Sequence, residues 1–185
     1  MSAAVFGIAI LLEFGGNPVR EVLAYSRPDV ASGELWRLVT SHFVHLGWTH
    51  MFLNIAGLAL VAWLVGGVFN WGRWLMVTVI TIAAIDAGFW LVYTELDWYV
   101  GLSGMLHGLL VAGLYSGIRE KDRESIVLLG FVLAKLTWEQ LSGPLPGSES
   151  TSGGDVIVNA HLYGTIGGAI AGALLWRRAE PEASI

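Results

Sequence analysis

The stretch THMFLNIAGLALVAWLVGGVF, residues 49–69, decides the fold class, because it is long, apolar and free of Asp, Glu, Lys and Arg. A helix needs about 20 such residues to cross the hydrocarbon core of a bilayer. Related segments occur elsewhere in the chain, and the sequence predicts an all-α membrane protein with spans at residues 2–14, 49–69, 74–94, 102–118, 125–141 and 156–176. The span at 2–14 is the shortest. We expect residues 1–185 to form a single transmembrane domain.

The composition agrees with a lipid-embedded chain. Hydrophobic residues make up 55% of the sequence and charged residues 14%, which is more apolar surface than a soluble domain of this size can bury. Nine Trp residues suit the membrane–water interface. The net charge of -5 leaves no basic patch for nucleic acid, and the absence of Cys excludes disulfides, thiolate metal sites and a cysteine nucleophile.

The distribution of Lys and Arg predicts the orientation, because short cytoplasmic loops are enriched in them. The turns containing Arg73 and residues 119–124, and the pair Arg177 and Arg178, are therefore expected in the cytoplasm. The loops around Asp97 and Glu149 lack basic residues and are expected outside. With six spans, both termini then lie in the cytoplasm. The long loop at residues 15–41 is an exception, since it contains three Arg residues yet has to lie outside.

Polar residues inside predicted spans are costly and mark candidate functional sites. His50, Asn54, Ser103 and His161 lie near the starts of three spans that run in the same direction. At about 1.5 Å per residue, they reach a similar depth below the outer surface. A hydroxyl, two imidazoles and an amide in one layer are the groups that nucleophilic acyl chemistry requires.

The chemistry of these groups suggests their roles. His161 can act as the base that activates the Ser103 hydroxyl. The backbone N–H of Ser103 lies at a predicted helix N-terminus, where N–H groups are unpaired. His50 and Asn54 are four residues apart on one helical face, so they can add side-chain donors for an oxyanion.

Glycine spacing predicts how the helices that carry these groups meet. Gly101 and Gly104 allow the backbone to approach Ser103 closely. Glycines recur every four residues in the fourth and sixth predicted spans, at 104 and 108 and at 164, 168 and 172. Such faces pack closely in lipid, and contact along them would bring Ser103 and His161 within hydrogen-bond distance.

Other polar residues in the spans allow more than one interpretation. His107, four residues after Ser103, either orients the site or fills space. Lys135 and Glu139 form an i, i+4 pair whose simpler role is mutual neutralisation, although Glu139 lies near the outer end, where it could contact substrate. Asp86 has no partner that the sequence identifies. A metal site at His42, His45 and His50 is disfavoured, since no acid joins them at ligand spacing, and no cofactor is expected.

Together these motifs resemble the rhomboid family of intramembrane serine proteases. The resemblance runs from about residue 34 to 176 and rests on four motifs in order: Trp36-Arg37, His45 with His50 and Asn54, Gly101-x-Ser103-Gly104, and Ala160-His161-x-x-Gly164. It implies a six-helix rhomboid-like bundle and a Ser103–His161 dyad without an acid. It also implies that His50, Asn54 and the Ser103 N–H stabilise the oxyanion.

A narrower similarity is to the rhombosortase branch, carried by WYVGLSGMLHG at 98–108, KLTWEQ at 135–140 with GPLPGSE at 143–149, and AHLYG at 160–164. This branch implies a bacterial inner-membrane enzyme that cleaves exported proteins at a C-terminal anchor containing Gly-Gly. His107 replaces an aromatic residue frequent in the wider family. The active site would face the periplasm, and Trp138 and Glu139 are candidates for a substrate gate.

Two alternative functions remain at this point. The first is a non-catalytic rhomboid-like protein that binds clients, which the presence of both Ser103 and His161 disfavours. The second is a small transporter or haem-binding membrane protein, for which neither an inverted repeat nor paired His ligands are evident.

Overall fold

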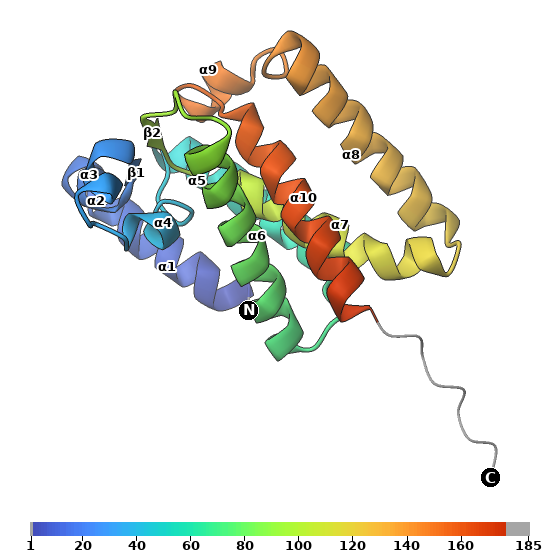
Figure 1. Ribbon diagram of the computed structural model, residues 1–185. Coiled ribbons are helices and arrows are strands. Elements are labelled where there is room, and N and C mark those ends of the chain that lie inside the picture. The colour runs from blue at the N-terminus through green and yellow to red at the C-terminus, as the bar shows by residue number, and fades with distance from the viewer. Residues whose placement is uncertain (1, 177–185) are drawn as a thin grey trace.

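The computed structural model describes residues 2–176, so Arg177 and Arg178 lie outside the described residues. The helices are α1 Ser2–Phe14, α2 Gly16–Leu23, α3 Arg27–Ala31, α4 Arg37–Thr40, α5 Trp48–Val65, α6 Trp71–Leu91, α7 Ser103–Arg119, α8 Arg123–Ser142, α9 Ser148–Ser152 and α10 Val158–Leu175. Two short strands, β1 Tyr25–Ser26 and β2 Trp98–Tyr99, pair antiparallel. Helices α6, α7 and α10 form the middle of the bundle, with α1 on one side and α8 on the other (Figure 1).

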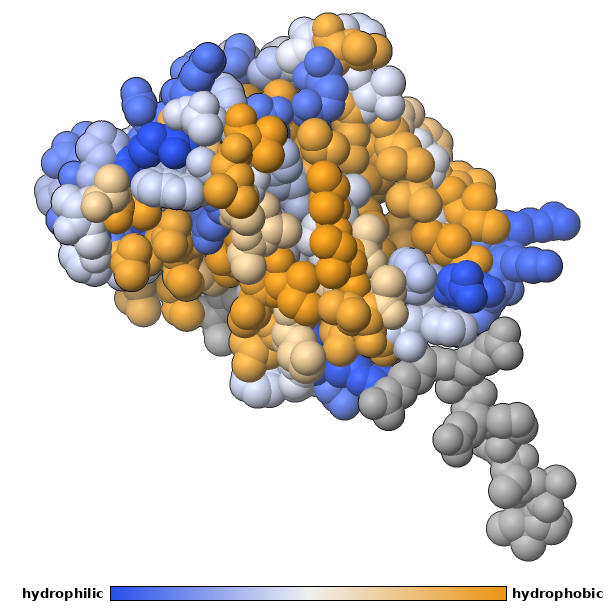
Figure 2. Space-filling model, viewed as in Figure 1, coloured by the Kyte–Doolittle hydropathy of each residue, from blue (hydrophilic) through white to orange (hydrophobic). Residues whose placement is uncertain are grey.

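Each predicted span corresponds to an observed helix. Three of the described helices, α5, α6 and α8, are long and apolar enough to cross a membrane, and the number of six spans stays a prediction. Hydrophobic side chains cover the middle of the face in Figure 2, over α6 and α10. Hydrophilic residues gather over α2 to α4 and at the turn between α7 and α8. An apolar middle between two hydrophilic ends is typical of a membrane protein.

The turn between α5 and α6 differs from its predicted bounds. We predicted spans that end at Phe69 and resume at Trp74, whereas α5 ends at Val65 and α6 begins at Trp71. The side chain of Asn70 accepts a hydrogen bond from the Arg73 N–H at 3.0 Å. This N-cap satisfies a backbone donor that the helix leaves unpaired, and so starts α6 earlier than hydropathy alone indicates.

The segment at residues 15–41, which we predicted to be a long polar loop, contains α2, β1, α3 and α4. The buried Arg37 side chain ties these elements together. Its guanidinium donates to the carbonyl oxygens of Glu21 and Ala24 at 2.7 and 2.8 Å and pairs with Glu34 at 2.7 Å. Such long-range bonds leave no periodic pattern in the sequence, so hydropathy missed these elements.

Arg27 connects the same loop to the end of α6. Its side chain donates to the carbonyl oxygens of Phe89 at 2.5 Å, Tyr93 at 3.1 Å and Leu96 at 3.0 Å. The last carbonyls of a helix have no partner within it, and a cation near them is favourable. The loop therefore closes the C-terminal end of α6.

The paired strands fix the segment that leads into α7. Tyr25 pairs with Tyr99, and Ser26 pairs with Trp98. The Gly101 N–H donates to the Ser41 carbonyl at 3.0 Å, and the Tyr99 hydroxyl donates to the Gly101 carbonyl at 2.6 Å. Gly101 has φ +129°, which a side chain would rarely adopt. The first loop thus holds the backbone that delivers Ser103.

The glycine faces of α7 and α10 are in direct contact. A Cβ atom added at Gly164 would collide with the Gly104 carbonyl, and one added at Gly168 would collide with the Gly108 carbonyl. The predicted packing of these two helices along their glycines is therefore confirmed. Small residues let helix backbones touch in lipid, where packing replaces the hydrophobic effect as the driving force.

Candidate active site

Ser103 and His161 lie side by side at the same end of the bundle. Ser103 is the first residue of α7, and His161 lies in the first turn of α10 with 5% of its surface exposed. The Ser103 Oγ and the His161 Nε2 are 3.0 Å apart. This distance allows the hydroxyl to donate its proton directly to the imidazole.

An acid, Glu139, contacts the opposite side of the His161 ring. Glu139 comes from α8, is 3% exposed, and places Oε2 2.9 Å from the His161 Nδ1. A carboxylate only accepts hydrogen bonds, so Nδ1 carries the imidazole proton and Nε2 keeps its lone pair for Ser103. The Lys135 Nζ donates to the other carboxylate oxygen at 2.6 Å and lies 3.3 Å from the His161 Nδ1.

His107 contacts the His161 ring and the backbone of Ser103. Its ring stacks on the His161 ring, with centroids 4.4 Å apart and planes 20° from parallel. Its Nδ1 donates to the Ser103 carbonyl at 2.7 Å. These contacts are those expected of a residue that orients the site, and that role for His107 stays a prediction.

A cavity of about 530 Å³ opens onto Ser103 and His161. Its walls include His50 and Asn54 from α5, the loop at residues 145–147, and Ser148, Thr151 and Ser152 from α9. Four groups that the sequence placed at one depth therefore line one space. The segment at residues 142–155 was predicted to be a loop, but Ser148–Ser152 within it form α9.

The histidine on α5 has a defined tautomer. The Leu46 N–H donates to the His50 Nδ1 at 3.3 Å, so the His50 proton resides on Nε2. That atom lies beside Gly101, whose added Cβ would be 3.3 Å from it. Asn54 donates to the His50 carbonyl at 3.1 Å with one of its two amide hydrogens. One donor on each side chain thus remains for a ligand in the cavity.

His45 lies in the loop before α5 and supports His50 from outside the cavity. The two rings meet edge to face with centroids 5.2 Å apart. Burial, together with the smaller effects of the charges of His50 and Arg20, lowers the pKa of His45 to about 3. His45 is therefore a neutral packing residue at physiological pH.

Sequence reasoning named Glu139 but did not connect it with His161. Its spacing from Lys135 suggested a self-sufficient ion pair, and that pair is present. The sequence feature that indicated a role in the site was the position of Glu139 near the predicted outer end of its span. Trp138, the other gate candidate, is 48% exposed on the outside of α8. Asp86 does have a neighbour, since the His42 Nε2 lies 3.5 Å from its Oδ1.

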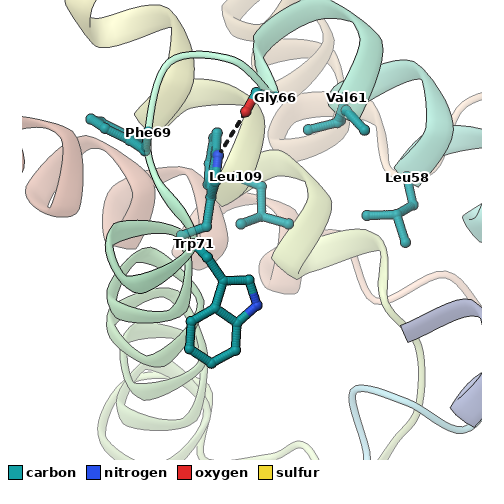
Figure 3. A pocket seen from close by; sticks show the side chains of 8 residues that line it. Leu58, Val61, Gly66, Phe69, Trp71 and Leu109 are labelled. Carbon is teal, nitrogen blue, oxygen red and sulfur yellow. Dashed lines mark hydrogen bonds between the residues drawn. The ribbon is translucent and has the colours of Figure 1, made fainter. Parts of the chain in front are cut away.

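A second pocket lies at the far end of α5, between α5, α6 and α7 (Figure 3). Its lining is apolar, and the Trp74 indole N–H at its edge is already bonded to the Gly66 carbonyl at 3.1 Å. Leu58, Val61 and Leu109 line the pocket, which contains no titratable side chain (Figure 3). It therefore lacks the groups for acid–base chemistry. Among residues 2–176, no group of three or more His, Asp or Glu side chains could hold a metal ion.

Comparison with known proteins adds an independent observation. Residues 32–178 match the Rhomboid domain. The rhomboid protease GlpG of Klebsiella pneumoniae is 28% identical over 137 residues, which cover 73% of this chain and 48% of that protein. YdcA of Bacillus subtilis is 27% identical over 159 residues, covering 82% of this chain and 72% of that protein.

GlpG of Salmonella newport is 25% identical over 140 residues, covering 75% of this chain and 49% of that protein. The chain thus spans about half the length of the GlpG relatives that it matches. The family match, by contrast, extends over most of the chain and includes α5 to α10, with His50, Asn54, Ser103 and His161. The protein therefore belongs to the rhomboid family.

Proposed function

We propose that this protein is an intramembrane serine endopeptidase in which Ser103 is the nucleophile and His161 is the general base. The observation that carries the proposal is the 3.0 Å approach of the Ser103 Oγ to the His161 Nε2 at the wall of an accessible cavity. Membership of the rhomboid family and the names of its protease relatives support the same chemistry.

Acylation would begin when the Ser103 Oγ attacks the carbonyl carbon of the scissile peptide bond. The hydroxyl proton passes to the His161 Nε2, and the carbonyl oxygen becomes an oxyanion. The Ser103 N–H, the His50 Nε2–H and the Asn54 amide are the donors available to that oxygen. His161 then returns its proton to the leaving amine, and the C–N bond breaks.

Deacylation would reverse these roles with water. The His161 Nε2 takes a proton from water as the water oxygen attacks the acyl–serine ester. Collapse of the second intermediate breaks the ester bond and returns the proton to the Ser103 Oγ. The cavity between α5 and α9 is large enough to hold both the reacting peptide segment and this water.

The substrate class that we propose is an exported protein with a C-terminal membrane anchor preceded by Gly-Gly. The rhombosortase-like motifs around Ser103, Glu139 and His161 support this class, and the apolar surface supports a partner within the bilayer. We further propose six spans within residues 1–185, the active-site end toward the periplasm of a bacterial inner membrane, and both termini in the cytoplasm.

A fluorophosphonate probe tests the nucleophile without knowledge of the natural substrate. The purified protein in lipid nanodiscs should be labelled at Ser103, and Ser103→Ala and His161→Ala should each lower the rate by at least about 1,000-fold. The matched control is Ser116→Ala, a serine on the same helix at the opposite end, which should label normally. Undiminished labelling of Ser103→Ala would overturn the assignment.

A second experiment tests the substrate class. A reporter carrying a Gly-Gly motif, a hydrophobic helix and a basic tail should be cleaved by the wild type and not by Ser103→Ala. The matched reporter has Ala-Ala in place of Gly-Gly and should be cleaved at least about tenfold more slowly. Equal cleavage of both reporters would leave the protease assignment standing and refute the Gly-Gly class.

A further inference from the structure

The geometry points to Glu139 as a third functional side chain: a positioning residue that fixes the His161 imidazole, so that the site works as a Ser103–His161–Glu139 triad with Lys135 holding the carboxylate. The inference rests on the proposed function. It departs from the dyad without an acid that the family resemblance implies. Its basis is a continuous chain of contacts across α7, α10 and α8.

Both contacts made by the His161 ring nitrogens are within hydrogen-bond distance. The Ser103 Oγ lies 3.0 Å from the His161 Nε2, and the His161 Nδ1 lies 2.9 Å from the Glu139 Oε2. With a carboxylate at Nδ1, the proton is held on that side and Nε2 must be the acceptor for Ser103. The acid thereby selects the tautomer that can act as a base.

Burial argues against a purely structural ion pair. Glu139 is 3% exposed and lies in a helix that is apolar enough to cross a membrane, where a carboxylate is costly. Lys135 bonds to Oε1 at 2.6 Å and would neutralise the carboxylate by itself. The ion pair with Lys135 does not account for the second carboxylate oxygen of Glu139, Oε2, which contacts His161.

The charges around His161 balance during the reaction. When the Ser103 proton moves to Nε2, His161 becomes an imidazolium next to the negative Glu139, which stabilises it. Lys135, 3.3 Å from Nδ1, opposes that charge. The remaining titratable groups near the ring are His107, stacked on it from α7, and His50 of α5, which lines the same cavity.

The first test compares labelling rates of Glu139 variants with a fluorophosphonate probe. Glu139→Gln should lower the rate at least about 100-fold, because an amide can donate to Nδ1 and move the ring proton to Nε2. Glu139→Asp keeps the carboxylate and should recover at least about tenfold over Gln. The matched control is Glu124→Gln, an exposed acid on the same helix, which should label at the wild-type rate.

The second test reads the tautomer directly. Histidine ¹⁵N NMR, with the His161 signals assigned from a His161→Gln difference spectrum, should place the ring proton on Nδ1 in the wild type and on Nε2 in Glu139→Gln. Thermal unfolding of both proteins identifies any loss of fold. A residue with only a structural role would change stability without moving this proton.

The outcomes separate this inference from the proposed function. A Glu139→Gln protein that labels at the wild-type rate, or that keeps its proton on Nδ1, overturns the triad while Ser103 remains the nucleophile. A wild-type protein without Ser103-dependent labelling overturns the proposed function and the triad with it. Slow labelling of Glu139→Gln, recovery in Glu139→Asp and a shifted ring proton together establish the positioning role.

Discussion

Gly104→Ala tests whether the contact between α7 and α10 sets the geometry of the site. The added Cβ would lie 2.8 Å from the Ala160 carbonyl oxygen, whereas ordinary contact begins at 3.4 Å. The two helices must therefore separate locally by about 0.6 Å, because close-packed interiors have no room to absorb the overlap. Gly104 follows Ser103 in the chain, and Ala160 precedes His161, so this wedge lies next to the reacting pair.

The size of the effect follows from that displacement. A shift of about 0.6 Å would lengthen the Ser103–His161 distance from 3.0 Å to about 3.6 Å, which is no longer a hydrogen bond. A misplacement of about 1 Å costs on the order of 100-fold in rate, so we expect labelling by fluorophosphonate to fall about 10- to 100-fold. Overpacking costs about 1–3 kcal/mol, and the better helix propensity of Ala offsets about 1 kcal/mol, so the protein should remain folded.

Gly130→Ala on α8 is the matched control for this prediction. It makes the same substitution within a helix, but a Cβ there would have no atom within 4 Å. Its labelling rate should equal that of the wild type, and its unfolding temperature should not fall. If Gly104→Ala labels as fast as Gly130→Ala at equal stability, the glycine contact does not set the distance between the catalytic side chains.

Two further predictions concern the segments that precede α5 and α7. Tyr99→Phe removes the donor to the buried Gly101 carbonyl, bonded at 2.6 Å; we expect a loss of about 1–3 kcal/mol in unfolding free energy and slower labelling, measured by denaturation and probe kinetics. For His45, the folded-state pKa of about 3 lies below its ordinary 6.5, so the unfolded chain binds more protons between these values. The free energy of unfolding should therefore be highest above pH 6.5 and lower by about 2 kcal/mol at pH 5. Thermal unfolding at these two pH values should show a smaller loss of stability in His45→Gln than in the wild type. An equal loss in both proteins would refute this role of His45.

The long helices could be predicted from sequence because their physical cause is local. An apolar run long enough to span a bilayer must pair its own backbone, so hydropathy located α5, α6 and α8 within a few residues. Helix ends were less accurate, since capping by a single side chain such as Asn70 decides them. The order in residues 15–41 could not be predicted, because Arg27 and Arg37 hold it through bonds to distant carbonyls.

Part of the candidate site could also be predicted. The predicted depths of Ser103 and His161 along spans that run in the same direction were enough to place the two residues together. Such depths depend only on the rise and direction of each helix. The contact between Glu139 and His161 depends on how α8 tilts against α10, and sequence spacing carries no information on that angle. The local pair with Lys135 offered a sufficient explanation for Glu139 and concealed its second partner.

The glycine contact between α7 and α10 also determines when the site can exist during biosynthesis. Chains are made from the N-terminus, so α7 with Ser103 is inserted while its glycine face still has no partner. His161 arrives only with α10, the last described helix, after α8 and α9 have been made. Under the roles proposed for these residues, the nascent protein carries Ser103 without its base until α10 docks against α7.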